Sequence, residues 1–139
     1  CGIHKTDAKY HRWLEAHEDY TIDYEKGVMK IDKIVPLCHS CHNFIHSGRL
    51  YMVSKTPELI QKAKDILEHG FNILETNNLT AFEGTIYLAR KLNVNHNCEI
   101  DEIILTSFAK WSDWKLVLEG KEYYSKFNEY EDWREFYKR

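Results

Sequence analysis

Side chains that could bind a metal ion are concentrated in residues 37–48, which read LCHSCHNFIHSG. Cys38 and Cys41 form a C-x-x-C pair within this segment, a spacing that lets two thiolates bind one tetrahedral zinc ion. Cys1 is a third candidate ligand. The fourth is either His4, four positions into the chain, or a residue upstream of Cys1. We therefore predict a structural zinc site.

A second set of candidate ligands begins with His42 and His46, which are four residues apart. On a helix this spacing places both imidazoles on one face, about one turn apart. His17, in the segment LEAHEDY at residues 14–20, is the candidate third ligand from a neighbouring strand. Three protein ligands with an open position are typical of a catalytic metal site. We therefore expect a catalytic divalent ion here.

The elements that must position these ligands are predicted to be a hairpin and a helix. Large and β-favouring residues predict a strand near residues 12–18, and Gly27 is a turn residue. Residues 28–37 follow as strand or loop, and we expect the chain to leave the sheet at Pro36. A short helix is expected from Ser40, ending at Gly48 because glycine is favoured just beyond a helix.

Residues 51–139 have a different pattern. Thr56 as N-cap and Pro57 at the first helical position predict one helix. Thr80 and Glu83 fit a capping box that would open a second helix. The elements expected after these are strands or a hairpin over residues 99–127 with a turn near Gly120, and a short aromatic helix over residues 130–139.

Composition limits the classes of function. The 139 residues have a formal net charge of −3, and residues 1–50 hold seven basic and seven acidic side chains, which argues against avid non-specific coating of DNA. No apolar run is long enough to span a membrane, and the polar first residues are not typical of a signal peptide. The C-x-x-C pair beside histidines indicates metal binding in a reducing compartment, so we expect a cytoplasmic protein.

The order C-G, L-E-A-H and L-C-x-x-C-H-x-x-x-H-x-G resembles the HNH endonucleases, the ββα-metal nucleases that carry a four-cysteine zinc knuckle. The resemblance implies an α+β fold with an HNH-like module at residues 1–52. Residues 53–139 would be a helical and β-hairpin accessory region. Cys1-Gly2 matches the second cysteine of the first pair in the family, which implies a further cysteine upstream. His17, His42 and His46 match the positions of the metal ligands.

Two positions depart from the family pattern. Glu18 stands where the general-base histidine is usual, and Lys33 stands where an asparagine is usual. The resemblance therefore implies His17, Glu18 and Lys33 as the catalytic residues. Either Glu18 accepts the proton of the attacking water, or His17 does so while Glu18 or Glu15 reaches the metal. Lys33 would contact a phosphate as a point charge.

The function implied is a metal-dependent endonuclease that hydrolyses phosphodiester bonds, in DNA rather than RNA. Its cofactors would be a structural Zn²⁺ and one catalytic divalent cation, which is Mg²⁺, Mn²⁺, Ni²⁺ or Zn²⁺. The alternative is a zinc-binding ββα module that has lost catalysis and binds nucleic acid or protein. The aromatic residues of the C-terminal region are expected in a core, or in an interface with a protein partner or a second copy.

The remaining histidines and the last cysteine show no pattern of ligands. We expect the histidines to be structural or surface residues, and the cysteine to be a small buried hydrophobe. These residues are His11, His39, His69, His96 and Cys98.

Overall fold

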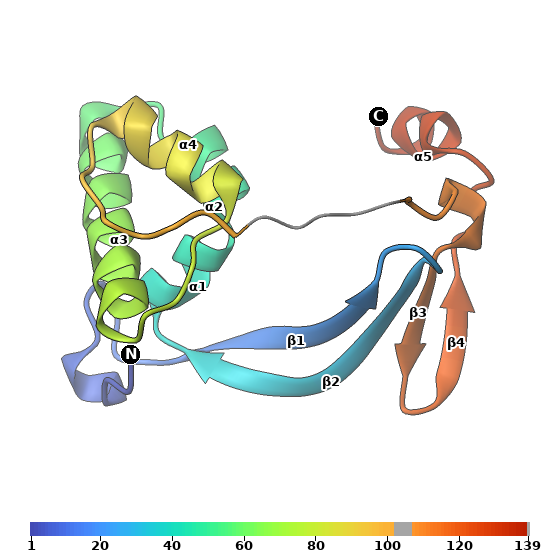
Figure 1. Cartoon of the computed structure of the whole chain (residues 1–139), viewed down its shortest axis with the longest axis horizontal. Coiled ribbons are helices and arrows are strands. Elements are labelled where there is room, and N and C mark those ends of the chain that lie inside the picture. Colours follow the sequence, from blue (N-terminus) through green and yellow to red (C-terminus); the bar gives the residue numbers. More distant parts are fainter. Residues whose placement is uncertain (102–106, 139) are drawn as a thin grey trace. The chain divides into compact units, whose positions relative to one another are not determined.

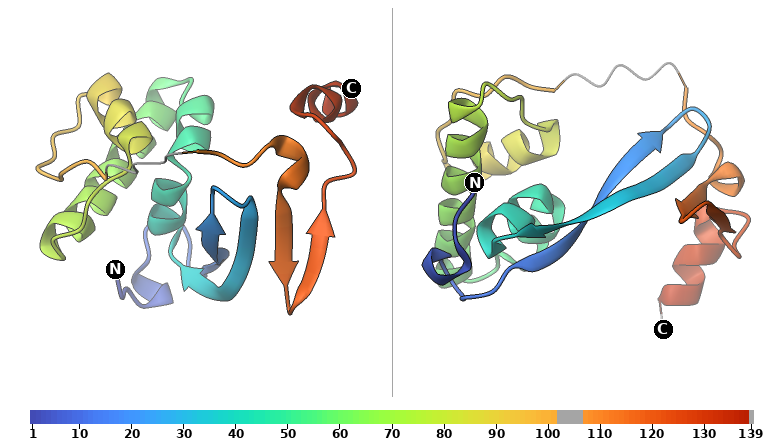
Figure 2. Two further views of the ribbon diagram at one scale, coloured as in Figure 1. Left: turned by 45° about the vertical axis from the view of Figure 1, so that its right-hand side comes forward. Right: turned by 90° about the horizontal axis from the view of Figure 1, so that it is seen from below.

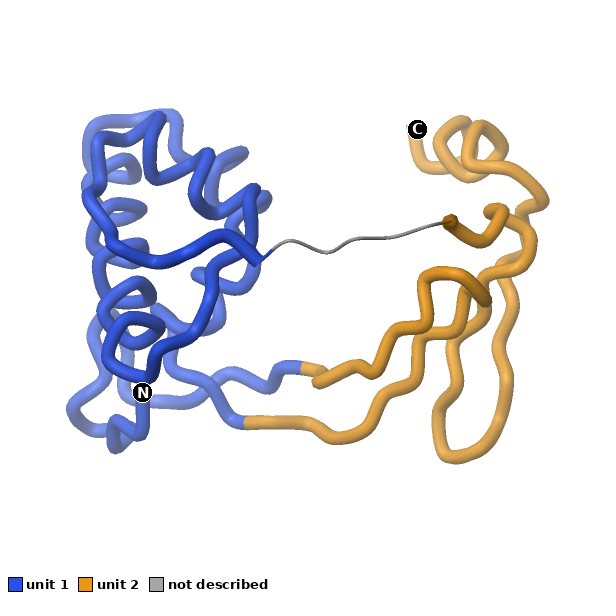
Figure 3. Tube along the Cα trace, viewed as in Figure 1, with its two compact units in different colours: residues 1–17, 36–103 blue, residues 18–35, 104–139 orange. Residues whose placement is uncertain are grey.

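The computed structural model describes residues 1–101 and 107–138, and its fold is α+β. The described residues form a four-stranded mixed sheet and five α-helices, shown in Figures 1 and 2. The chain divides into two compact units (Figure 3): unit 1 comprises residues 1–17 and 36–103, and unit 2 comprises residues 18–35 and 104–139. The modules expected at 1–52 and 53–139 stay a prediction.

The first two strands are consecutive and neighbours in the sheet. Strand β1 spans Glu15–Asp23 and strand β2 spans Val28–Leu37, joined by a turn that ends at Gly27. Gly27 has φ +67°, a backbone conformation that favours glycine, and a Cβ there would lie only 2.8 Å from the Cβ of Ala109. Both the conformation and the lack of space therefore require glycine at this position. The strand expected near 12–18 begins later, at Glu15, and the preceding Trp13 stacks on His11.

The helix after the hairpin differs from the expectation. Helix α1 spans His39–Ile45, with Cys38 as its N-cap, and helix α2 follows at Ser47–Val53. Two corrections result. Strand β2 continues through Pro36 to Leu37, and Gly48 lies inside α2 rather than ending the helix. The break comes instead at His46, whose φ of −90° and ψ of 45° are not helical.

The long helix α3 spans Pro57–Thr76 and begins as predicted, with the Thr56 hydroxyl accepting from the backbone N–H of Leu59. A Cβ at Gly70 would overlap the ring of Phe44 on α1. Glycine therefore lets α1 and α3 approach closely. The core of unit 1 lies around this contact and is formed by Leu50, Ala63, Ile66, Leu67, Phe71, Ala81, Ile86, Leu88, Ala89 and Val94.

Helix α4 spans Glu83–Leu92, but its N-cap is Phe82 and not the predicted Thr80. The capping box is absent because the backbone of Ala81 is already engaged. Its N–H donates to the carbonyl of Glu99, and its carbonyl accepts from the N–H of Asp101, at 2.9 Å in both cases. The helix therefore starts only after this bridge.

Unit 2 contains the rest of the sheet. Strand β3 (Lys115–Leu118) pairs in parallel with β2, with Val28 opposite Lys115, and antiparallel with β4 (Lys121–Tyr124). The predicted hairpin with a turn at Gly120 is confirmed for these strands, while residues 102–106 of the expected segment lie outside the described residues. The predicted aromatic helix is α5, Tyr130–Tyr137. Within the described residues, no helix is both long and apolar enough to cross a bilayer.

Candidate metal centres

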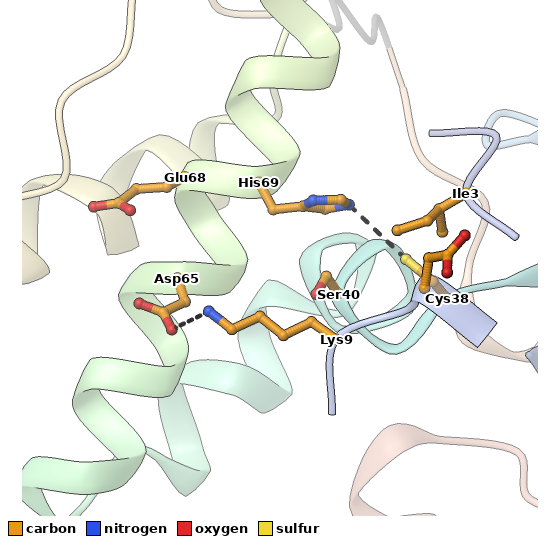
Figure 4. A pocket seen from close by; sticks show the side chains of 8 residues that line it. Ile3, Lys9, Cys38, Ser40, Asp65, Glu68 and His69 are labelled. Atoms are coloured by element: carbon orange, nitrogen blue, oxygen red, sulfur yellow. Dashed lines mark hydrogen bonds and ion pairs between the residues drawn. The ribbon is translucent and has the colours of Figure 1, made fainter. Parts of the chain in front are cut away.

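The cysteines converge on a histidine of α3. The Sγ atoms of Cys1 and Cys38 are 3.6 Å apart, and Nε2 of His69 lies 3.8 Å from Sγ of Cys38 and 3.4 Å from Sγ of Cys41. Figure 4 shows His69 pointing from α3 toward Cys38. The cluster joins the chain's first described residue, the start of α1 and the middle of α3. These four side chains lie close enough to hold a metal ion such as zinc.

The separations fit a tetrahedral zinc ion. Bonds of about 2.3 Å to sulfur and about 2.0 Å to nitrogen separate two sulfurs by about 3.8 Å and a sulfur from a nitrogen by about 3.5 Å. Burial and the neighbouring Cys38 raise the pKa of the Cys41 thiol to about 11 when no cation is present. Burial also lowers the pKa of His69, which favours the neutral imidazole that binds metal.

The candidate fourth ligand from the sequence, His4, lies elsewhere. It caps a short 3₁₀ helix (η1, Lys5–Asp7), and its Nδ1 is 2.8 Å from the hydroxyl of Thr6. His69 takes the fourth position, although it was expected to be a structural or surface residue. The only local signal was the adjacent Gly70, since a glycine inside a long helix often marks a close packing contact.

The second predicted set also converges. The rings of His17, His42 and His46 are pairwise T-shaped, with centroids 4.9–5.3 Å apart, and their ligand atoms all lie within 4.8 Å of one another. His17 comes from β1, His42 from α1 and His46 from the residue that ends α1. Nδ1 of His17 is buried and has no hydrogen-bond partner among the described residues. A cation bound at that nitrogen would satisfy it.

Glu15 connects this set to a third one. One carboxylate oxygen, Oε2, accepts from Nδ1 of His42, while Oε1 lies 2.8 Å from Nε2 of His11 and 2.8 Å from Nδ1 of His39. Burial raises the pKa of Glu15, but the adjacent imidazoles of His39, His42 and His11 outweigh it and lower the pKa to about 2. His11 and His39 show no ligand pattern in the sequence and are expected to be structural or surface residues, but the structure brings both of them to Glu15.

The other two predicted catalytic residues lie outside these sets. Glu18 is exposed on β1, and Lys33 forms an ion pair with Asp19, 3.4 Å from Nζ to Oδ2, with 65% of its side chain exposed. Within unit 2, both line a pocket that also includes Gly120. Their catalytic roles stay predictions.

We found no match for the chain among family models, curated proteins or solved structures.

Proposed function

We propose that the chain is a metal-dependent nuclease that hydrolyses phosphodiester bonds in DNA. The observation that carries the proposal is the convergence of His17, from a hairpin strand, with His42 and His46, from the end of the helix that follows. Such a hairpin and helix, holding an ion between them, is the arrangement expected from the resemblance to the HNH endonucleases. DNA as the substrate rests on that resemblance.

The donor set favours particular ions. Imidazoles suit Zn²⁺ and Ni²⁺, whereas Mg²⁺ prefers oxygen ligands. When bound, such an ion stabilises negative charge on the phosphate and on the leaving oxygen. His42 is prepared to act as a ligand, because its Nδ1–H donates to Glu15 and its Nε2 therefore carries the lone pair. We expect higher activity with Zn²⁺ or Ni²⁺ than with Mg²⁺.

The proton acceptor follows from the geometry of β1. Successive side chains of a strand point to opposite faces, so Glu15 and His17 share one face and Glu18 lies on the other. This alternation favours His17 over Glu18 as the group that accepts the proton of the attacking water. In that role His17 would leave the ion to His42 and His46, with Glu15 supporting the metal site through His42. Lys33 would act on a bound phosphate only after leaving its ion pair with Asp19.

The proposal is tested by nicking of supercoiled DNA with each of the four divalent ions. We expect His42→Ala and His46→Ala to lower the divalent-dependent rate by about 100-fold or more, because each removes a ligand of the reactive ion. His4→Ala is the matched control, since His4 lies outside all three clusters, and should nick like the parent protein. If the parent protein nicks no DNA with any ion, the proposal fails and a non-catalytic zinc-binding module is favoured.

A further inference from the structure

The histidines and the carboxylate near the start of β1 form a separate cluster. Nε2 of His11 and Nδ1 of His39 lie 3.2 Å apart, and each is 2.8 Å from Oε1 of Glu15. Only 12% of the His11 side chain, 19% of His39 and 22% of Glu15 are exposed. Three polar atoms thus converge in a largely enclosed place.

The tautomer of His11 decides how these atoms interact. Nδ1 of His11 lies 3.0 Å from the carbonyl oxygen of Trp13, and a carbonyl can only accept, so Nδ1 carries the proton. In the neutral imidazole Nε2 then has a lone pair, and this lone pair faces the carboxylate of Glu15. Two acceptors at hydrogen-bond distance repel each other unless a positive charge lies between them.

A metal ion would supply that charge, and the spacing of the two nitrogens fits one. A tetrahedral zinc ion with bonds of about 2.0 Å separates two ligand atoms by about 3.3 Å, close to the 3.2 Å between the nitrogens. The two 2.8 Å separations between Oε1 of Glu15 and these nitrogens are shorter, and would widen by about 0.5 Å around the ion. Two imidazoles and one carboxylate are a ligand set that zinc accepts, with water as the fourth ligand. The hydrogen bond from Nδ1 of His11 to a backbone carbonyl is also the support that metal-bound histidines usually have.

The surroundings hold the ligands in this orientation. The indole of Trp13 stacks on the His11 ring, 3.9 Å between centroids and 3° from parallel. The ring of Tyr10 packs edge-on against His39, with centroids 5.3 Å apart. The amide of Asn43 donates to the backbone carbonyl of His39 at 2.9 Å, which fixes the start of α1 beside the cluster. The ligands are therefore preorganised.

We propose that His11, Glu15 and His39 bind a further zinc ion, distinct from the cysteine-bound ion and from the ion of His17, His42 and His46. Glu15 would bind this zinc through Oε1 and accept from His42 through Oε2. The two ions of this region would therefore be linked by one carboxylate. The site does not require that the chain be a nuclease.

The test compares zinc content of the whole chain, purified with zinc and dialysed against a zinc buffer, by native mass spectrometry and elemental analysis. We expect His11→Ala and His39→Ala each to bind one zinc fewer than the parent protein. His4→Ala should bind the same number as the parent protein. Retention of the cysteine-bound zinc by the two variants reports that unit 1 has folded.

Two results would overturn the proposal. One is an unchanged zinc content in both His11→Ala and His39→Ala. The other is a zinc-loaded crystal in which no anomalous peak lies between Glu15, His11 and His39, which would indicate an imidazolium paired with the carboxylate instead. Neither result depends on nicking. Conversely, if His46→Ala nicks DNA as fast as the parent protein, the nuclease proposal fails. This site can still bind its zinc in that case.

Discussion

Glu15 is the residue through which two histidine clusters are joined, because its two oxygens face different imidazoles. Replacing Glu15 with glutamine removes the charge but keeps the shape of the side chain. This change can distinguish an effect on metal affinity from an effect on the rate of catalysis. We expect Glu15→Gln to raise the divalent concentration needed for half-maximal nicking by about 10–100-fold, as loss of a carboxylate behind a ligating histidine usually does. The maximal rate at saturating metal should change much less. A metal titration of the nicking rate measures both quantities.

Glu18→Gln is the matched comparison on the opposite face of the same strand. Because alternation along β1 directs Glu18 away from His17, its maximal rate and its metal requirement should both stay within about twofold of the parent protein. If the maximal rate instead falls by about 100-fold or more, Glu18 is the general base and the assignment of His17 is wrong.

At the scale of elements, the packing of α1 on α3 brings His69 to the cysteines. We expect Gly70→Ala to destabilise the protein by about 1–3 kcal/mol, because the new methyl group would meet the ring of Phe44. Gly48→Ala is the control. Nothing lies within 4 Å of a Cβ built there, so alanine in α2 should stabilise by up to about 1 kcal/mol. Thermal and chemical unfolding of the zinc-loaded proteins would measure both.

An unfolding free energy that is equal in Gly70→Ala and the parent protein would show that α1 and α3 do not pack this closely. A loss of zinc in Gly70→Ala without a loss of helix would place the strain at His69 itself. A destabilised Gly48→Ala would favour the earlier expectation that Gly48 ends a helix.

Local patterns predicted the elements that depend on neighbouring residues. The Thr56 cap, the turn at Gly120 and the His42/His46 spacing are all set by residues a few positions apart. The patterns failed where a distant segment decides the outcome. The bridge of Ala81 moved the start of α4, and the contact of α1 with α3 selected His69 over His4. The start of α4 and the identity of the fourth ligand depend on tertiary packing, which the spacing of residues in the sequence does not reveal.

At the scale of the whole molecule, stability should depend on pH partly through the ion pair of Lys9 and Asp65, seen in Figure 4. Hydrogen bonds from Lys9 and Gln61 lower the pKa of Asp65 below its unfolded value. The stabilisation is therefore present above the unfolded pKa and is lost as pH falls through the folded pKa. The bond to Asp65 also raises the pKa of Lys9, so that contribution is lost as pH rises through the folded value of Lys9.

We expect Asp65→Asn to be less stable than the parent protein near neutral pH, and the difference to shrink as the solution is acidified. Urea unfolding of both proteins at a series of acidic pH values measures the difference in their unfolding free energies. Release of metal ions at low pH should lower the stability of both proteins equally, so it does not change this difference. Glu68→Gln, an exposed carboxylate on the same helix, serves as the control. A difference that does not change with pH would show that the ion pair contributes nothing.

The pairing of β3 with β2 in unit 2 affects how a truncated fragment of the protein would behave. All the candidate ligands lie within residues 1–69, yet β3, which pairs with Val28–Lys30 of β2, comes from beyond residue 107. A fragment that stops at residue 101 would keep every ligand but expose the backbone donors and acceptors of β2. An open strand edge recruits other chains, so we expect this metal-binding fragment to be more prone to aggregation than the whole chain.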